Sequence, residues 1–220
     1  MQVKIQMLYS TPKNVKTTFI SDPLPAGEAV IMAEDMQKTG RISNIMFVDT
    51  KEQEWNLKEL KKLLEGIEDE PHDITIYFDG GYDINSGRAG LGCAIYYKQN
   101  GKAFRIRKNA LVDELSSNNE AEYAALHLAL KELEYLGAGH MEVNIIGDSK
   151  VVIHQLNGEW PVYEETLSKW ADRIDTKLEQ LGFDPHYEAI SRKNNREADQ
   201  LAGQALRGEE MFSTLELEEK

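Results

Sequence analysis

Two apolar segments of this chain each lead into an aspartate: DITIYFDGG contains Asp79, and MEVNIIGDS contains Asp148. In the first, Ile74, Ile76 and Phe78 alternate with less apolar residues, which is the period of a β-strand. Strands this apolar belong in the centre of a sheet. A carboxylate at the buried edge of a sheet is costly unless a cation compensates its charge. The pattern therefore predicts a sheet that gathers carboxylates around a bound cation.

The elements around these two strands predict an α/β domain over residues 74–208. AGLGCAIYYKQNGKAFRIRKNAL is typical of two strands joined at Gln99-Asn100-Gly101. The remaining elements are expected to be a helix capped by Ser117-Asn118-Asn119, a helix from Ser149, a helix over 164–181, the strand PHYEAI and a helix over 195–206. This order predicts a mixed five-stranded sheet with helices on both faces. Residues 209–220 are acidic and are expected to form a frayed tail.

A charged break, EGIEDEPHD at residues 65–73, predicts a boundary before this domain. Residues 1–70 are then a small α+β domain with the order ββαββα, in which Phe47 and Trp55 are expected to pack in the core. No chemical motif occurs in it. A module that contacts another protein is favoured over one that grips nucleic acid, and its role stays open.

The composition limits what the chain can bind. A net charge of -13 argues against broad nonspecific binding of nucleic acid, although bound divalent cations would reverse the potential where carboxylates cluster. The single cysteine, Cys93, lies in an apolar segment and is expected to fill the core. We find neither a signal peptide nor an apolar run long enough to cross a bilayer, so we expect a cytoplasmic protein without a membrane partner.

Four acidic residues are the candidates for chemistry, namely Asp79, Glu122, Asp148 and Asp199. Taken singly, each also fits a turn, a helix cap or a solvated helix position. Glu122 and Asp199 fall near the starts of predicted helices, where the helix dipole tolerates negative charge. Four converging carboxylates would repel one another, whereas two divalent ions would satisfy them and leave positions for phosphate and water. We expect two Mg²⁺ ions, with Mn²⁺ as a substitute.

In this order, IYFDGG, SNNEAEYAAL, IIGDSKVVIHQL and NNREADQLA resemble the motifs of type 1 ribonuclease H. The resemblance covers nearly all of residues 74–208 and leaves residues 1–70 as an N-terminal extension. It implies that Asp79, Glu122 and Asp148 bind the metals most directly and that Asp199 completes the second site. The metal-binding glutamate is matched by Glu122 and not by Glu120, which is left as a first-turn residue of no special role.

The resemblance also implies contacts with an RNA–DNA hybrid near the cut. Asn118, Asn119 and the backbone at Gly80 match family positions of this kind, although the two asparagines also fit simple helix capping. Many members carry a histidine in the loop before the last aspartate. Here the loop reads SRKNN, as in histidine-lacking relatives, and Arg192 is expected to orient a phosphate. His186 lies in the preceding predicted strand and is not a candidate for that role.

The leading hypothesis is an endonuclease that cuts the RNA strand of RNA–DNA hybrids and leaves 5′-phosphate and 3′-hydroxyl ends. Residues 157–178, where some members carry a basic protrusion, are mostly acidic or neutral, and Trp160 and Trp170 are expected to pack in the core. The alternative is therefore a catalytically weak or inactive nucleic-acid-binding protein that acts through its N-terminal domain. A nuclease of the same superfamily with another substrate, such as an exonuclease or transposase, is the third reading.

Overall fold

The chain is described by a computed structural model that covers residues 1–218, apart from the side chains of residues 67 and 68. It divides into two compact units, with the division between Asp69 and Glu70. Among the described residues, no helix has the length and apolar character needed to cross a membrane. The two units are described separately below.

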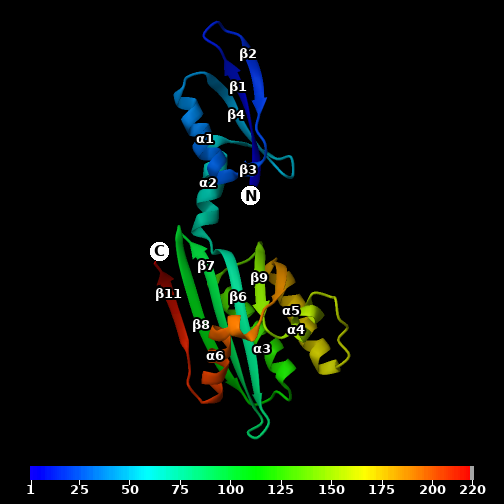
Figure 1. The fold of residues 1–220 in the computed structure, drawn as a ribbon. Coiled ribbons are helices and arrows are strands. Elements are labelled where there is room, and N and C mark those ends of the chain that lie inside the picture. The colour runs from blue at the N-terminus through cyan, green and yellow to red at the C-terminus, as the bar shows by residue number, and fades with distance from the viewer. Residues whose placement is uncertain (219–220) are drawn as a thin grey trace. The chain divides into compact units, whose positions relative to one another are not determined.

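The N-terminal unit is a small antiparallel sheet packed against two helices (Figure 1). Its elements are β1 (Gln2–Ser10), β2 (Lys16–Ile20), β3 (Leu24–Pro25), α1 (Ala26–Lys38), β4 (Ile42–Asp49), β5 (Glu54–Asn56) and α2 (Leu57–Asp69). Alternate residues of β1, among them Val3 and Ile5, point into a core that includes Phe47, with Trp55 at its margin. The expected order ββαββα is present, and the two-residue strand β3 is added to it.

The C-terminal unit is built on a six-stranded mixed sheet with the order β10-β9-β6-β7-β8-β11. Its strands are β6 (His72–Asp83), β7 (Arg88–Gln99), β8 (Lys102–Val112), β9 (Glu142–Gly147), β10 (Asp184–Ala189) and β11 (Phe212–Leu217). Strand β9 runs parallel to both of its neighbours, β6 and β10. The other pairs are antiparallel. The sheet is therefore mixed, as the sequence predicts.

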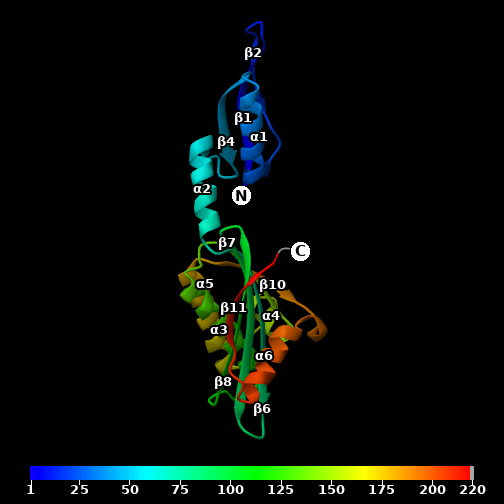
Figure 2. The ribbon, with the colours of Figure 1, turned by 90° about the vertical axis from the view of Figure 1, so that its left-hand side faces the viewer.

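Helices cover both faces of this sheet. They are α3 (Asn118–Leu136), α4 (Lys150–Leu156), α5 (Glu165–Leu181) and α6 (Arg196–Leu206), with a short 3₁₀ helix, η1 (Arg192–Asn194), before the last of them. Figure 2 shows α3 and α5 on one side of the sheet and α6 on the other. Cys93 lies in the core beneath α3, as expected, and burial raises the pKa of its thiol to about 12. The predicted α/β class is confirmed.

Two glycines of β7 let α6 lie directly on the strand. A Cβ atom at Gly92 would lie 2.4 Å from the carbonyl oxygen of Ala198, and one at Gly90 would lie 2.2 Å from that of Ala202. Any side chain at these positions would push the helix away. This close approach places the first turn of α6, which carries Asp199, over the middle of the sheet.

The prediction of a frayed tail over residues 209–220 is wrong for the part of the chain that the structure describes, because Phe212–Leu217 form β11 and extend the predicted five strands to six. Residues 219 and 220 lie outside the described residues. The side chain of Asn109 anchors the turn into β11. Its Nδ2 donates to the carbonyl of Glu209 at 2.8 Å, and its Oδ1 accepts from the Met211 amide at 2.7 Å. Backbone pairing along β8, which local charge does not reveal, therefore orders a segment that looks disordered in sequence.

Candidate functional site

Three carboxylates from separate elements converge in one pocket of the C-terminal unit. Asp79 comes from β6, Glu122 from the first turns of α3, and Asp148 follows β9. One oxygen of each lies within 4.8 Å of the others, and we call these three residues the pocket cluster. Asp79 does not end its strand as expected, because β6 continues to Asp83. The rest of the pocket lining comes from Gly80, Gly81, Asn118, Ser149 and Arg192.

The start of α3 reaches the pocket because residue 80 is glycine. A Cβ atom there would lie 2.2 Å from the backbone carbon of Ala121, so no other residue fits without moving the helix. The contact also orients the glutamate, since the backbone N–H of Gly80 donates to Oε2 of Glu122 at 3.3 Å. The glycine and its backbone N–H thus hold the Glu122 carboxylate of α3 beside strand β6.

Burial and mutual repulsion give the pocket cluster its electrostatic character. Burial, followed by the negative charges of Asp148 and Asp199, raises the pKa of Asp79 to about 7. Burial, followed by the charges of Asp79 and Asp148, raises the pKa of Glu122 to about 9, against the opposing effect of the Gly80 N–H. Both carboxylates are more than nine-tenths buried. Such a site favours either protons or cations.

Asn195 connects Asp148 to the sheet, a role that the sequence did not reveal. Its side chain is 1% exposed. Its Nδ2 donates to the carbonyl of Phe78 at 2.8 Å and to Oδ1 of Asp148 at 3.2 Å. The residue lies directly before α6, so the sequence suggested only a helix boundary there. The tertiary contact makes it a positioning residue for the pocket cluster.

Asp199 lies beside the pocket cluster but is held by another partner. Its Oδ1 accepts from Arg192, with Nε at 2.9 Å and Nη2 also within hydrogen-bond distance. The negative charge of Asp199 still contributes to the raised pKa of Asp79. The structure therefore brings three of the four predicted carboxylates within ligand distance of one another and places the fourth nearby in an ion pair.

The two asparagines predicted to contact substrate lie at the start of α3. Asn118 lines the pocket, and its Oδ1 accepts from the backbone N–H of Tyr82 at 3.3 Å. Asn119 is half-buried in the same turn. The helix cap itself is Ser117, whose hydroxyl accepts from the Glu120 N–H at 3.1 Å. Capping is thus provided by the serine rather than by the asparagine side chains.

Glu120 was expected to have no special role, and this is wrong. Its carboxylate accepts from the backbone N–H and hydroxyl of Ser116, at 2.9 and 2.8 Å, and from the Trp170 indole at 3.0 Å. Although burial raises it, these hydrogen bonds bring the pKa of Glu120 below its ordinary value. Glu120 ties the start of α3 to α5, and is thereby unavailable to the pocket cluster.

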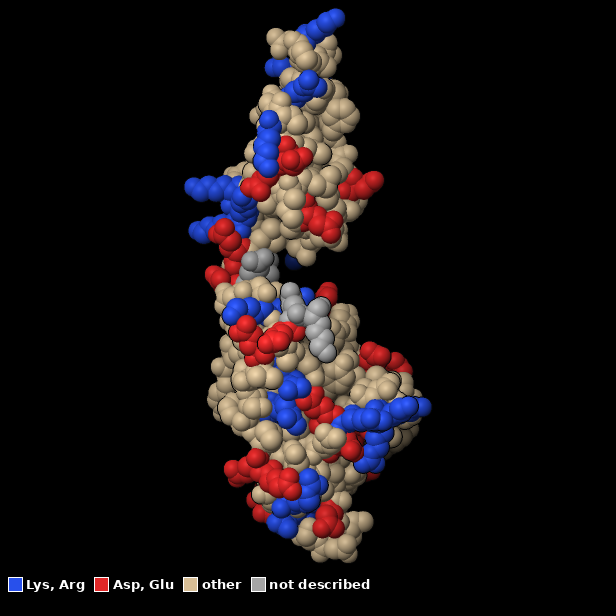
Figure 3. Space-filling model, turned by 60° about the vertical axis from the view of Figure 1, so that its left-hand side comes forward, with Lys and Arg blue, Asp and Glu red and all other residues tan. Residues whose placement is uncertain are grey.

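Residues 157–178, where a basic protrusion would be expected by resemblance, have few Lys or Arg side chains that are not paired with an acidic residue. Lys169 pairs with Glu165 at 2.7 Å, and Lys177 pairs with Glu134 at 3.1 Å. Acidic and basic side chains are interspersed on the face of this unit seen in Figure 3. Trp170 is half-buried against the core, as predicted.

Trp160, by contrast, is not a core residue. It is 45% exposed and stacks on the ring of His154 at 4.6 Å. The prediction failed because the segment between α4 and α5 runs over the surface. There the Trp160 indole packs on the His154 ring instead of entering the core.

Comparison with known proteins places this fold and site in a family. The sequence model of the family described as "Reverse transcriptase-like" matches residues 77–205. An uncharacterized protein of Bacillus subtilis, YpeP, is 46% identical over 86% of this chain and 83% of its own length. Ribonuclease HI of Halobacterium salinarum is 31% identical over 60% of this chain and 64% of its own length. The bifunctional protein Rv2228c of Mycobacterium tuberculosis is also 31% identical, and there the match spans 35% of the longer relative.

Solved structures agree with this placement. The N-terminal RNase H domain of Rv2228c superimposes with a TM-score of 0.54 and 29% identity, over 62% of this chain and 94% of that one. LC11-RNase H1, solved in complex with an RNA/DNA hybrid, has a TM-score of 0.54 and 31% identity, over 62% of this chain and 98% of that one. These matches leave the N-terminal unit without a counterpart in the two structures.

Proposed function

Because this chain belongs to the reverse transcriptase-like family and carries a ribonuclease H-like domain, we propose that it is a ribonuclease H that cuts the RNA strand of RNA–DNA hybrids. It acts as an endonuclease and leaves 5′-phosphate and 3′-hydroxyl ends. The complex of LC11-RNase H1 with a hybrid supports this substrate.

The observation that carries the proposal is the pocket cluster itself. Asp79, Glu122 and Asp148 offer only carboxylate oxygens, with ligand atoms within 4.8 Å of one another. Hard oxygen donors suit Mg²⁺, with Mn²⁺ as a substitute. Neither buried carboxylate forms an ion pair with a Lys or Arg among the described residues. The donor set therefore fits divalent cations, and two ions are the natural number once Asp199 joins it.

Bound divalent ions would activate a water molecule on one side of the scissile phosphate and stabilise the leaving 3′-oxygen on the other. The chain's own residues prepare this site. The Gly80 N–H orients Glu122, and the buried Asn195 amide orients Asp148. Such supporting hydrogen bonds fix the direction in which each ligand points.

Around the pocket, four groups contact the hybrid in this proposal. They are Asn118, Asn119, the backbone at Gly80, and Arg192. The Arg192 guanidinium binds Asp199, and it is free to bind a phosphate oxygen when a metal ion takes over that carboxylate. Arg192 lies in the loop where many members carry a histidine; it would orient a phosphate there but could not act as a general base.

We also propose that the protein acts in the cytoplasm and that its N-terminal unit contacts a protein partner. The alternative function is a weak or inactive hybrid-binding protein that acts through that unit. The engagement of Asp199 by Arg192 is the observation that favours it, because a retained ion pair would keep the second metal ion out.

The test is incubation of the full chain with labelled RNA–DNA hybrid, duplex DNA and duplex RNA, in Mg²⁺ and in Mn²⁺, beside Asp79→Asn. We expect cleavage of the hybrid's RNA strand alone, with products that a 5′-phosphate-dependent exonuclease degrades. Hybrid cleavage no greater than that of Asp79→Asn in either metal would overturn the enzymatic proposal. Tight hybrid binding in that case would favour the alternative.

A further inference from the structure

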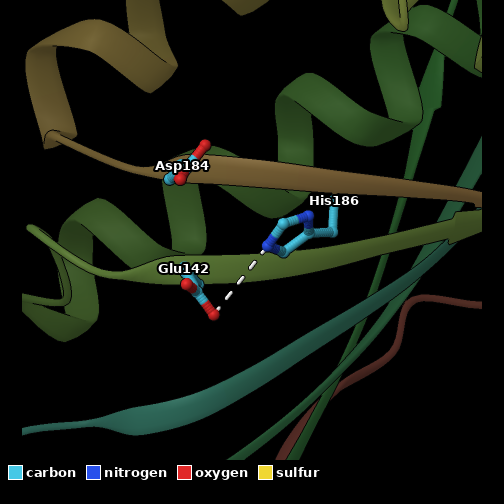
Figure 4. Close-up of side chains that lie close together, drawn as sticks. All are labelled: Glu142, Asp184 and His186. Atoms are coloured by element: carbon cyan, nitrogen blue, oxygen red, sulfur yellow. Dashed lines mark ion pairs between the residues drawn. The ribbon is translucent and has the colours of Figure 1, made fainter. Parts of the chain in front are cut away.

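A second group of metal-ligand side chains lies on the sheet far from the pocket. Glu142 begins β9, and Asp184 begins β10 directly opposite it in the parallel pairing. His186, two residues further along β10, points to the same face of the sheet. One ligand atom from each lies within 4.8 Å of the others. Figure 4 shows the His186 ring directed toward the Glu142 carboxylate. We call these three residues the strand-edge cluster.

The charges of the strand-edge cluster are not balanced within the described part of the chain. Glu142 and Asp184 face each other across two strands, an arrangement of like charges that destabilises a sheet. Neither forms an ion pair with Lys or Arg among residues 1–218. The one ion pair given for the cluster joins Nε2 of His186 to Oε2 of Glu142, at 3.8 Å. The two carboxylates carry two negative charges beside one imidazole, and a divalent cation would neutralise them.

The imidazole distinguishes this donor set from an ordinary acidic patch and from the pocket cluster. Hard ions such as Mg²⁺ prefer oxygen ligands alone, whereas imidazole nitrogen suits Zn²⁺ and other first-row transition ions. Zn²⁺ binds both imidazole nitrogen and carboxylate oxygen, and three protein ligands can leave its fourth position to a water molecule. All three side chains are exposed, so that position is open to solvent.

We propose that Glu142, Asp184 and His186 bind one first-row divalent transition-metal ion, for which Zn²⁺ is the probe. The ion joins β9 to β10, the outermost strand of this side of the sheet. Asp148 follows Glu142 by six residue steps along β9, or roughly 20 Å, so the site is distinct from the pocket cluster. The inference does not depend on the proposed function.

The test is a calorimetric titration of the full chain with Zn²⁺ in excess Mg²⁺, which keeps the pocket cluster filled with its own cation. We expect one Zn²⁺ per chain. His186→Ala should weaken the affinity at least tenfold, and Asp184→Asn should do so too. Glu188→Gln is the matched control, because it lies on the same face of β10 and removes one negative charge, as Asp184→Asn does. It should bind Zn²⁺ as the unchanged chain does.

A second measurement separates specific ligation from loose attraction. The X-ray absorption spectrum of the Zn²⁺-loaded chain should show an imidazole nitrogen that disappears in His186→Ala, and Zn²⁺ should raise the melting temperature of the unchanged chain but not of that variant. Because all three positions are exposed, the variants should fold normally. Equal Zn²⁺ affinity in His186→Ala and the unchanged chain, or a spectrum with oxygen ligands alone, would overturn the proposal.

Discussion

The pocket cluster and the strand-edge cluster each bring three ligand atoms within 4.8 Å of one another, but they differ in exposure: the strand-edge residues are all exposed, whereas Asp79 and Glu122 are buried and Asp148 is intermediate. In the pocket, burial and neighbouring carboxylates raise the pKa values of Asp79 and Glu122 to about 7 and about 9. On the strand edge, water screens the charges and the three groups are exposed. Spacing alone therefore does not define a site, because burial decides how strongly the carboxylates need a cation.

The two clusters also differ in what supports them. Glu122 and Asp148 each accept a hydrogen bond from a group fixed by packing, the Gly80 N–H and the buried Asn195 amide. The strand-edge cluster is positioned by the strand pairing and by the ion pair between His186 and Glu142. Preorganised, supported ligands suit catalysis, and exposed ones suit a site that only holds an ion. Four predictions test this difference, from the largest expected effect to the smallest.

Asp148→Asn should lower Mg²⁺-dependent hybrid cleavage by on the order of 10⁴-fold, about 5 kcal/mol of transition-state stabilisation, because it removes a proposed metal ligand that the Asn195 amide positions. Single-turnover cleavage of a labelled hybrid measures this. Asp113→Asn, which replaces an exposed aspartate outside the pocket, controls for lost charge. Comparable cleavage rates in the two variants would show that Asp148 is not part of the catalytic site.

Glu122→Gln should stabilise the metal-free fold at high pH. The raised pKa of Glu122 means that the folded chain keeps a proton which the unfolded chain, with an ordinary pKa of 4.5, releases. Stability from this group is thus full below about pH 4.5 and is lost as pH rises toward 9. In EDTA at pH 9 the variant should exceed the unchanged chain by on the order of 3–5 kcal/mol.

Urea unfolding at a series of pH values measures that difference, and the two chains should converge near pH 5. Saturating Mg²⁺ should reverse the order at high pH, because only the carboxylate gains from the cation. Parallel pH profiles in EDTA would show that Glu122 does not carry the shifted pKa.

Asn195→Ala should weaken cleavage about 10–100-fold, the usual effect of losing a group that orients a metal ligand. It should also lower the free energy of unfolding by about 1–3 kcal/mol, because buried polar partners lose their hydrogen bonds. The matched control is Asn194→Ala at the exposed neighbouring position. A positioning role further predicts that the variant needs more Mg²⁺ for half-maximal cleavage, and an unchanged Mg²⁺ dependence would leave Asn195 a purely structural residue.

Glu142→Gln should change the free energy of unfolding by less than about 0.5 kcal/mol in the absence of transition metals, because the group is exposed. The small change should be stabilising, since repulsion from Asp184 is relieved. Chemical unfolding in EDTA measures it beside Glu122→Gln. An effect of several kcal/mol would mean that the two clusters do not differ as their burial indicates.

Much of the fold follows from local patterns in the sequence. The alternation in β6 predicts that strand, and the Asn100-Gly101 turn predicts the hairpin of β7 and β8. Both turn residues have positive φ, as such a turn requires. The cap of α3 falls within the expected run, at Ser117, and α4 begins where expected, with Ser149 as its cap. These features depend on neighbours in the chain, which is why they can be read from it. Strand β11 could not be read in this way, since its order comes from pairing with β8 and from Asn109.

By itself, the sequence determined which carboxylates belong to the family's motifs, because residue type and spacing are local properties. The tertiary structure decided what each carboxylate does. It engages Glu120 with Trp170, leaves Glu122 facing Asp79, and pairs Asp199 with Arg192. It also brings Glu142 beside His186, more than forty residues apart in sequence. The reason is physical: burial and pairing register arise from the packing of whole elements, and no single segment contains them.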